Sequence, residues 1–243
     1  MEAQAGVLQG EALIDHAINE LYAMTGALRP SLRCPTVRLA ELIGAFNLTC
    51  SELDGLTQAR AAQELARRGA LMEEKGGNTE PLAGFLYAVA DYGSIFVEQD
   101  DPVSRRRFSA AHELGHYLLH FRPLFDQAED GAELLEVFEA LPRGDEDSEP
   151  DELPYGQILF PMPERQAPRL PPLAQMEREA NQFAAELLMP SELVRELTTR
   201  ARRYFSDEDL VWRLATDLLV SRAAMRWKLR SLGLLPYEAV RWN

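Results

Sequence analysis

The hydrophobic pattern of residues 1–81 is typical of a helical region. Apolar residues spaced three and four apart recur in residues 11–24, 35–46 and 54–71, which predicts three amphipathic helices. The apolar face of the first is formed by Leu13, Ala17, Leu21 and Met24. The stretch Lys-Gly-Gly-Asn-Thr-Glu-Pro after the third pattern is rich in helix breakers and indicates the end of this region.

The pattern becomes strand-like after residue 81. Residues 85–90 and 94–98 are rich in aromatic and β-branched side chains, and a turn-forming stretch separates them, so we expect a β-hairpin. A basic patch follows, and Ser109 is a candidate N-cap for the next helix. That helix should end at Arg122, because proline follows and disfavours helical geometry in the residue before it.

Residues 123–172 have the composition of a long loop, acidic in the first part and proline-rich in the second. We expect at most a short helix within it, over residues 133–141. A connection of this length is usually functional or disordered. Helical periodicity returns at residues 176–190 and continues nearly to the end of the chain.

The strands are few and precede the main helices, which predicts an α+β fold that is mainly helical with a small antiparallel sheet. We expect an N-terminal helical region (1–81), a central core (82–200) that contains residues 123–172 as an insert, and a C-terminal helical region (201–243).

The composition of the chain indicates its cellular compartment and argues against two classes of binding partner, nucleic acids and membranes. The formal net charge is −14, and residues 126–152 alone hold twelve acidic residues against one basic residue, which argues against direct nucleic-acid binding. No apolar run reaches the ~18 residues needed to cross a bilayer. The N-terminus lacks the pattern of a secretory signal, and the two cysteines provide no disulfide framework. We therefore expect a cytoplasmic protein without membrane partners.

Three of the four histidines lie in the stretch Ala-His-Glu-Leu-Gly-His-Tyr-Leu-Leu-His, residues 111–120. On a helix, His112 and His116 are one turn apart on one face and can bind a single zinc ion. Glu113 lies beside that face and can act as the general base without being a ligand. The alternative is a helix whose surface histidines happen to cluster.

A catalytic zinc ion usually has three protein ligands and one open position. His120 lies a further turn along the helix, so we expect it to pack or to support a ligand. Glu177 is the better third metal ligand, because it lies on or beside the apolar face of residues 176–190, where an unpaired carboxylate is costly. Asn181, one turn later, can orient a ligating imidazole. Glu179 points elsewhere and is the weaker choice of ligand.

The two motifs, Arg105–His120 and Glu177–Pro190, resemble the ImmA/IrrE family of bacterial zinc metallopeptidases, and the resemblance covers most of the chain. It implies a gluzincin-like core, with His112, His116 and Glu177 as zinc ligands and Glu113 as general base. It also implies an endopeptidase that cleaves helix-turn-helix repressors of the Xre or phage type and so controls mobile-element or stress-response genes. The long acidic segment between the motifs departs from the family pattern.

Some alternatives stay open at this stage. A His-His-Glu set accepts manganese as well as zinc. The oxyanion donor is undecided among Tyr92, Tyr117, Tyr155, Tyr204 and His120. The acidic segment can recognise a basic partner such as the DNA-binding face of a repressor, cover the cleft as an inhibitory lid, or serve as a solvated linker.

The rival hypothesis from another class is a DNA-binding regulator. Residues 206–233 predict a helix, a turn at Val220 and a second helix capped by Ser221, which resembles a helix-turn-helix motif. The second helix carries the basic residues Arg222, Arg226, Lys228 and Arg230. A metal-binding scaffold without catalytic activity is a further alternative.

Overall fold

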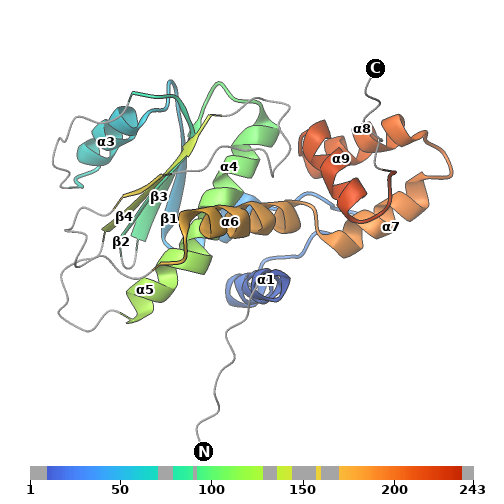
Figure 1. Ribbon diagram of the computed structural model, residues 1–243, viewed down its shortest axis with the longest axis horizontal. Coiled ribbons are helices and arrows are strands. Elements are labelled where there is room, and N and C mark those ends of the chain that lie inside the picture. The colour runs from blue at the N-terminus through green and yellow to red at the C-terminus, as the bar shows by residue number, and fades with distance from the viewer. Residues whose placement is uncertain are drawn as a thin grey trace, which may run out of the picture.

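The computed structural model describes residues 10–70, 79–89, 92–127, 136–143, 157–159 and 170–236 (Figure 1). In chain order, the elements are α1 (Glu11–Thr25), α2 (Leu39–Gly44), β1 (Leu48–Leu53), α3 (Gln58–Arg67), β2 (Leu82–Val89), β3 (Tyr92–Glu98), α4 (Val103–His116), the π-helical segment η1 (Tyr117–Phe121), α5 (Arg122–Gln127), β4 (Glu136–Pro142), β5 (Gln157–Leu159), α6 (Leu173–Leu188), α7 (Ser191–Ala201), α8 (Asp207–Leu218) and α9 (Arg222–Ser231).

The strands form one sheet in the order β1-β3-β2-β4-β5. Strands β2 and β3 make the predicted antiparallel hairpin, although both begin earlier than predicted. Strand β1, inside the region predicted to be helical, pairs in parallel with β3 and makes the sheet mixed. The predicted α+β class is confirmed. The missed strand, Leu-Thr-Cys-Ser-Glu-Leu, carries mostly polar side chains between two buried leucines and therefore lacks a clear strand pattern.

The two faces of the sheet are covered by different helices. On one face, Ala61 and Leu65 of α3 pack with Phe85 and Phe96 in a small apolar cluster. The opposite face of the sheet packs against the main core, to which α1, α4 and α6 contribute (Figure 1). Alternate residues of each strand therefore enter different environments, and only those on the α4 side can reach a site on that helix.

The helix that carries the histidines departs from the prediction at both ends. It begins at Val103 after Pro102, so Ser109 is a buried residue inside the helix and not its N-cap. It also does not end at Arg122, since η1 and α5 continue it. Pro123 therefore lies inside a continuous helix, and the wider π-helical turn before it accommodates the hydrogen bond that proline cannot donate.

The segment 123–172 is more structured than predicted. Residues 133–141, expected to form at most a short helix, contain most of strand β4 instead. This strand pairs with β2 from Val89↔Glu136 to Leu82↔Pro142, and β5 pairs with its outer edge. Its buried side chains alternate, with Val137 in the main core and Phe138 and Ala140 in the α3 cluster. Sheet pairing has overridden a sequence pattern that also suits a helix. The rest of the segment lies outside the described residues.

Helices α7, α8 and α9 lie together at the end of α6 that is remote from the sheet (Figure 1). The predicted turn at Val220 is confirmed, because α8 ends in the left-handed residue Leu219 and the Ser221 hydroxyl accepts a hydrogen bond from Ala224 N. No helix in the described part of the chain is both long enough and apolar enough to cross a bilayer.

Candidate metal centre

Helices α4 and α6 approach each other closely at Gly115. A Cβ atom at this position would lie 3.0 Å from Cδ1 of Phe183 and 3.3 Å from the Cα atom of Ala180. A larger residue at position 115 therefore fits only if a neighbouring atom of α6 moves by a few tenths of an ångström. The close approach places the histidines of α4 opposite the polar residues Glu177 and Asn181 of α6.

The three predicted metal ligands converge at this crossing. The Nε2 atoms of His112 and His116 are 3.0 Å apart. The Glu177 carboxylate places Oε2 3.5 Å from His112 Nε2 and Oε1 3.3 Å from His116 Nε2. Zinc bonds of ~2.0–2.1 Å in a tetrahedron put ligand atoms about 3.3 Å apart. The spacing of these three side chains therefore fits one zinc ion.

Hydrogen bonds to the other ring nitrogens determine the state of the two imidazoles. His112 Nδ1 lies 2.9 Å from Asn181 Oδ1 and donates to it, so His112 Nε2 carries a lone pair. His120 Nε2 donates to Glu179 Oε2 at 3.1 Å. His120 Nδ1 then accepts from His116 Nδ1 at 3.3 Å, which leaves a lone pair on His116 Nε2 too.

Two lone pairs thus face each other within 3.0 Å beside a buried carboxylate. Burial also lowers the pKa of His112 to about 3 and that of His116 well below its usual value, so both rings stay neutral. A cation bound between the two Nε2 atoms and the Glu177 carboxylate would accept both lone pairs and balance the negative charge. This donor set supports the metal hypothesis over a chance cluster of surface histidines, because both rings are completely buried.

His120 and Asn181 lie where a supporting role requires them. His120 does not belong to the group of histidine and carboxylate side chains whose ligand atoms converge. Each of the two contacts the Nδ1 atom of one imidazole, His120 that of His116 and Asn181 that of His112. Glu179 hydrogen-bonds His120 and so acts one step further away.

The Glu113 carboxylate is fully buried on the sheet side of α4 and lies against Gly84 of β2. A side chain at position 84 would collide with Glu113 Oε1, so the glycine makes room for the carboxylate. Burial, together with the charge of Glu177, raises the pKa of Glu113 to about 8.

A further carboxylate, Glu139 of β4, enters the same space and was missed in the sequence analysis. It is fully buried, and it belongs with His112, His116 and Glu177 to a group whose ligand atoms all lie within 4.8 Å of one another. Burial and the neighbouring Glu113 carboxyl raise the pKa of Glu139 well above its usual value. The sequence signal that could have revealed Glu139 is the alternation of side chains along β4, in which a charged residue lies on the same face as the buried Val137.

Comparison with known families decides the relationship. The family model of Peptidase M78, described as the IrrE N-terminal-like domain, matches residues 67–136 and 160–230, which is more than half of the chain. The chain belongs to the Peptidase M78 family. The resemblance to ImmA/IrrE proteins is thereby confirmed. The search of curated proteins returns no match for the chain.

The matched ranges of the Peptidase M78 model include all of α4 and α6, and with them His112, Glu113, His116 and Glu177. They omit residues 137–159, which contain Glu139 and nearly all of β4. The metallopeptidase motifs thus lie inside the family match, whereas the additional carboxylate lies outside it.

The candidate oxyanion donors are scattered. Tyr92 and Tyr204 are exposed, and Tyr155 lies outside the described residues. Tyr117 is buried, but its ring packs against Phe46 and Phe125. Among the described members of the set, His120 is the one recorded in contact with a predicted ligand.

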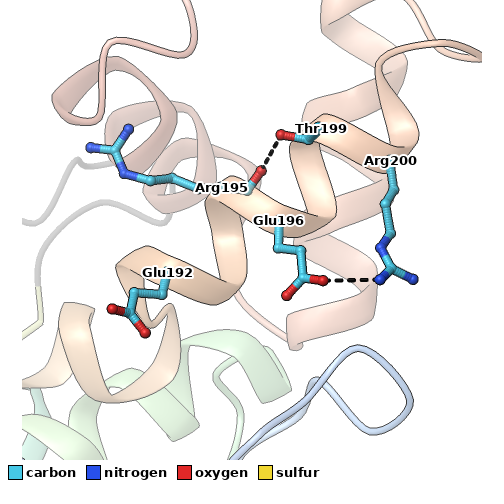
Figure 2. A pocket seen from close by; sticks show the side chains of 5 residues that line it. All are labelled: Glu192, Arg195, Glu196, Thr199 and Arg200. Atoms are coloured by element: carbon cyan, nitrogen blue, oxygen red, sulfur yellow. Dashed lines mark hydrogen bonds and ion pairs between the residues drawn. The ribbon is translucent and has the colours of Figure 1, made fainter.

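Figure 2 shows a hollow on the surface along α7, distinct from the buried centre. It is lined by Glu192, Arg195, Glu196, Thr199 and Arg200. Glu196 and Arg200 form an ion pair of 2.9 Å, and Arg195 Nη1 donates to the carbonyl of Leu232. These interactions engage three of the four charged side chains that line the hollow.

Proposed function

We propose that this Peptidase M78 protein is a zinc-dependent endopeptidase. The observation that carries the proposal is the convergence of two unprotonated Nε2 atoms and the Glu177 carboxylate, with the Glu113 carboxylate in the same enclosed space. His112, His116 and Glu177 would hold the metal. When bound, zinc supplies Lewis-acid polarisation of the scissile carbonyl and activates water for attack. The same donor set also accepts manganese.

Glu113 is the residue that moves the proton in this proposal. As a carboxylate it accepts a proton from the attacking water, and as a carboxylic acid it donates that proton to the leaving amine. Glu113 is completely buried, which separates its carboxyl from bulk water. Asn181 and His120 orient the two imidazoles through their Nδ1 atoms.

The proposed substrate is a basic helix-turn-helix repressor of the Xre or phage type, whose cleavage switches on stress-response or mobile-element genes. Support comes from the family and from the twelve acidic residues of segment 126–152, which suit a basic partner. Attraction of this kind falls as salt rises.

The test combines zinc analysis with cleavage of a purified repressor encoded beside this protein's gene. The wild type should cut the repressor at one position, and Glu113→Gln should retain zinc but lose cleavage by at least about 100-fold, the typical share of a general base. Neutralising the acidic residues from Asp145 to Glu152, which leaves β4 intact, should slow cleavage mainly at low salt. Retained cleavage by Glu113→Gln would refute the assigned role.

A DNA-binding regulator is the second candidate, favoured by the helix–turn–helix arrangement of α8 and α9. Its basic residues are partly engaged within the protein, because Arg226 pairs with Glu208 and Lys228 with the half-buried Glu186. Fluorescence anisotropy with random-sequence duplex at low salt separates the candidates. Binding that persists in Glu113→Gln, with no cleavage by either protein, would favour the regulator.

A further inference from the structure

Glu139 enters the metal centre from a part of the chain that the family model does not match. It lies on β4, paired opposite Leu86 of β2, and its side chain is fully buried. Its neighbour Val137, two residues earlier and on the same face of the strand, packs in the main core. An apolar residue would therefore be the ordinary occupant of position 139.

A buried carboxylate needs a compensating partner, because desolvation of the charge is costly. Neither oxygen of Glu139 accepts a hydrogen bond from an N–H or hydroxyl group of the described residues. Its hydrogen-bonding neighbour is the Glu113 carboxyl, and two carboxyls can share such a bond only through a proton. The ionisable neighbours that influence it are Glu113 and Glu177, both of which are acidic. The missing partner must therefore be a cation or a proton.

The position of Glu139 identifies the cation. One of its carboxylate oxygens lies within 4.8 Å of ligand atoms on His112, His116 and Glu177. The latter three already have spacings that fit one zinc ion. Ligand atoms of a tetrahedral zinc shell lie about 3.3 Å apart, so Glu139 is near enough to be a candidate for the fourth position.

We propose that Glu139 is a fourth metal ligand that closes the centre in the resting protein. The inference rests on the proposed function, in which the metal serves peptide hydrolysis. Structural zinc sites have four protein ligands, whereas catalytic sites keep one position open for water or substrate. With Glu139 bound, that position is occupied, and the peptidase is latent until Glu139 leaves.

The surrounding strands make the closure stable. β4 is held between β2 on one side and β5 on the other, so its backbone cannot withdraw without breaking sheet pairing. Opening the centre requires the Glu139 side chain to rotate away or β4 to detach.

The test uses the variant Glu139→Gln, which keeps the size of the side chain and removes its charge. The matched control is Glu192→Gln, the same change at an exposed position of α7 (Figure 2). Zinc affinity is measured by competition with a chromophoric chelator. Glu139→Gln should bind zinc at least about tenfold more weakly than wild type, since even supporting residues of a metal centre cost 10–100-fold, while Glu192→Gln should not differ.

Cobalt substitution gives a second readout that needs no substrate. The visible spectrum of the Co²⁺-loaded wild type should be unchanged by azide, because no coordination position is open. The spectrum of Glu139→Gln should shift on azide addition. If Glu139→Gln fails to fold, Glu139→Asp takes its place. This variant keeps the charge but shortens the side chain by one methylene, so it should also admit azide.

Equal zinc affinity in wild type and Glu139→Gln, or the same azide response in both, would overturn the inference. Failure of the proposed function would give another result. Zinc affinity and the azide response would still differ between wild type and Glu139→Gln, but neither protein would hydrolyse a repressor or casein. If both proposals hold, Glu139→Gln at saturating zinc should hydrolyse casein faster than wild type. Slower hydrolysis with unchanged zinc affinity would instead make Glu139 a substrate-positioning residue and would contradict the closed centre.

Discussion

Replacing Gly115 by alanine tests whether the distance between α4 and α6 sets the geometry of the metal centre. The new methyl group would lie 3.0 Å from Phe183 Cδ1 and 3.3 Å from Ala180 Cα, whereas ordinary contacts begin at 3.4 Å. Phe183 is fully buried and the Ala180 atom belongs to the backbone. A neighbour must therefore move by a few tenths of an ångström. Because one of the contacts is to the backbone of Ala180, we expect α6 to move, which also moves Glu177 away from the two imidazoles.

The expected magnitude follows from two opposing effects. Alanine in place of glycine favours the helix by about 1 kcal/mol. Overpacking of a tight core costs about 1–3 kcal/mol. The net loss of unfolding free energy is thus about 0–2 kcal/mol, or a fall in Tm of up to ~8 °C at 2–4 °C per kcal/mol for a chain of this size. Zinc affinity should fall about 10–100-fold, as for other changes that displace ligands.

The assay pairs thermal unfolding of the zinc-free protein with chelator competition. Gly44→Ala is the control, because a Cβ atom at Gly44, the last residue of α2, meets nothing within 4 Å. That variant should be as stable as wild type or slightly more stable, with unchanged zinc affinity. Gly115→Ala that matches Gly44→Ala in both measurements would refute the argument that the helix crossing positions the ligands.

Two further predictions concern the hydrogen bonds and the protons of the centre. Asn181→Ala removes the acceptor of His112 Nδ1 and should weaken zinc binding about 10–100-fold by chelator competition, whereas Asn181→Asp, which keeps an acceptor, should not. In zinc-free protein the raised pKa values of Glu113 and Glu139 give stability that is present below pH ~4.5 and lost as pH rises through the folded-state values. Between about pH 6.5 and 8, above the range in which the histidines oppose this trend, urea unfolding should show stability falling with pH. The stability of Glu113→Gln should fall less steeply, because one of the two carboxyls is gone and its charge no longer raises the pKa of Glu139. An unchanged slope would contradict a proton held at Glu113.

The part of the site carried by helices could be predicted from the sequence. The spacing of His112 and His116 determines that both rings project from one side of α4, and the apolar stripe of α6 determines which face Glu177 and Asn181 share. These are local properties of one helix each. That the two faces meet follows from the family resemblance and from the core, since both helices bury their apolar residues against each other.

The strand contribution to the site could not be predicted in the same way. Residues 133–141 satisfy both a helical and a strand pattern, and only pairing with β2 decides between them. The choice matters for position 139, because alternation along a strand directs its side chain to the α4 face together with Val137. β1 was missed for a related reason, since its partner β3 is more than 40 residues away in the sequence.

The crossing of α4 and α6 also has a consequence for how the protein acquires its metal. His116 and Glu177 are separated by 61 residues, so a nascent chain that has emerged only as far as α4 has the two imidazoles but lacks Glu177. The entropy of closing that loop is recovered only when the helices pack. We therefore expect the metal to bind only after the chain has folded. A chain that is still being synthesised would then lack the metal and could not hydrolyse peptides.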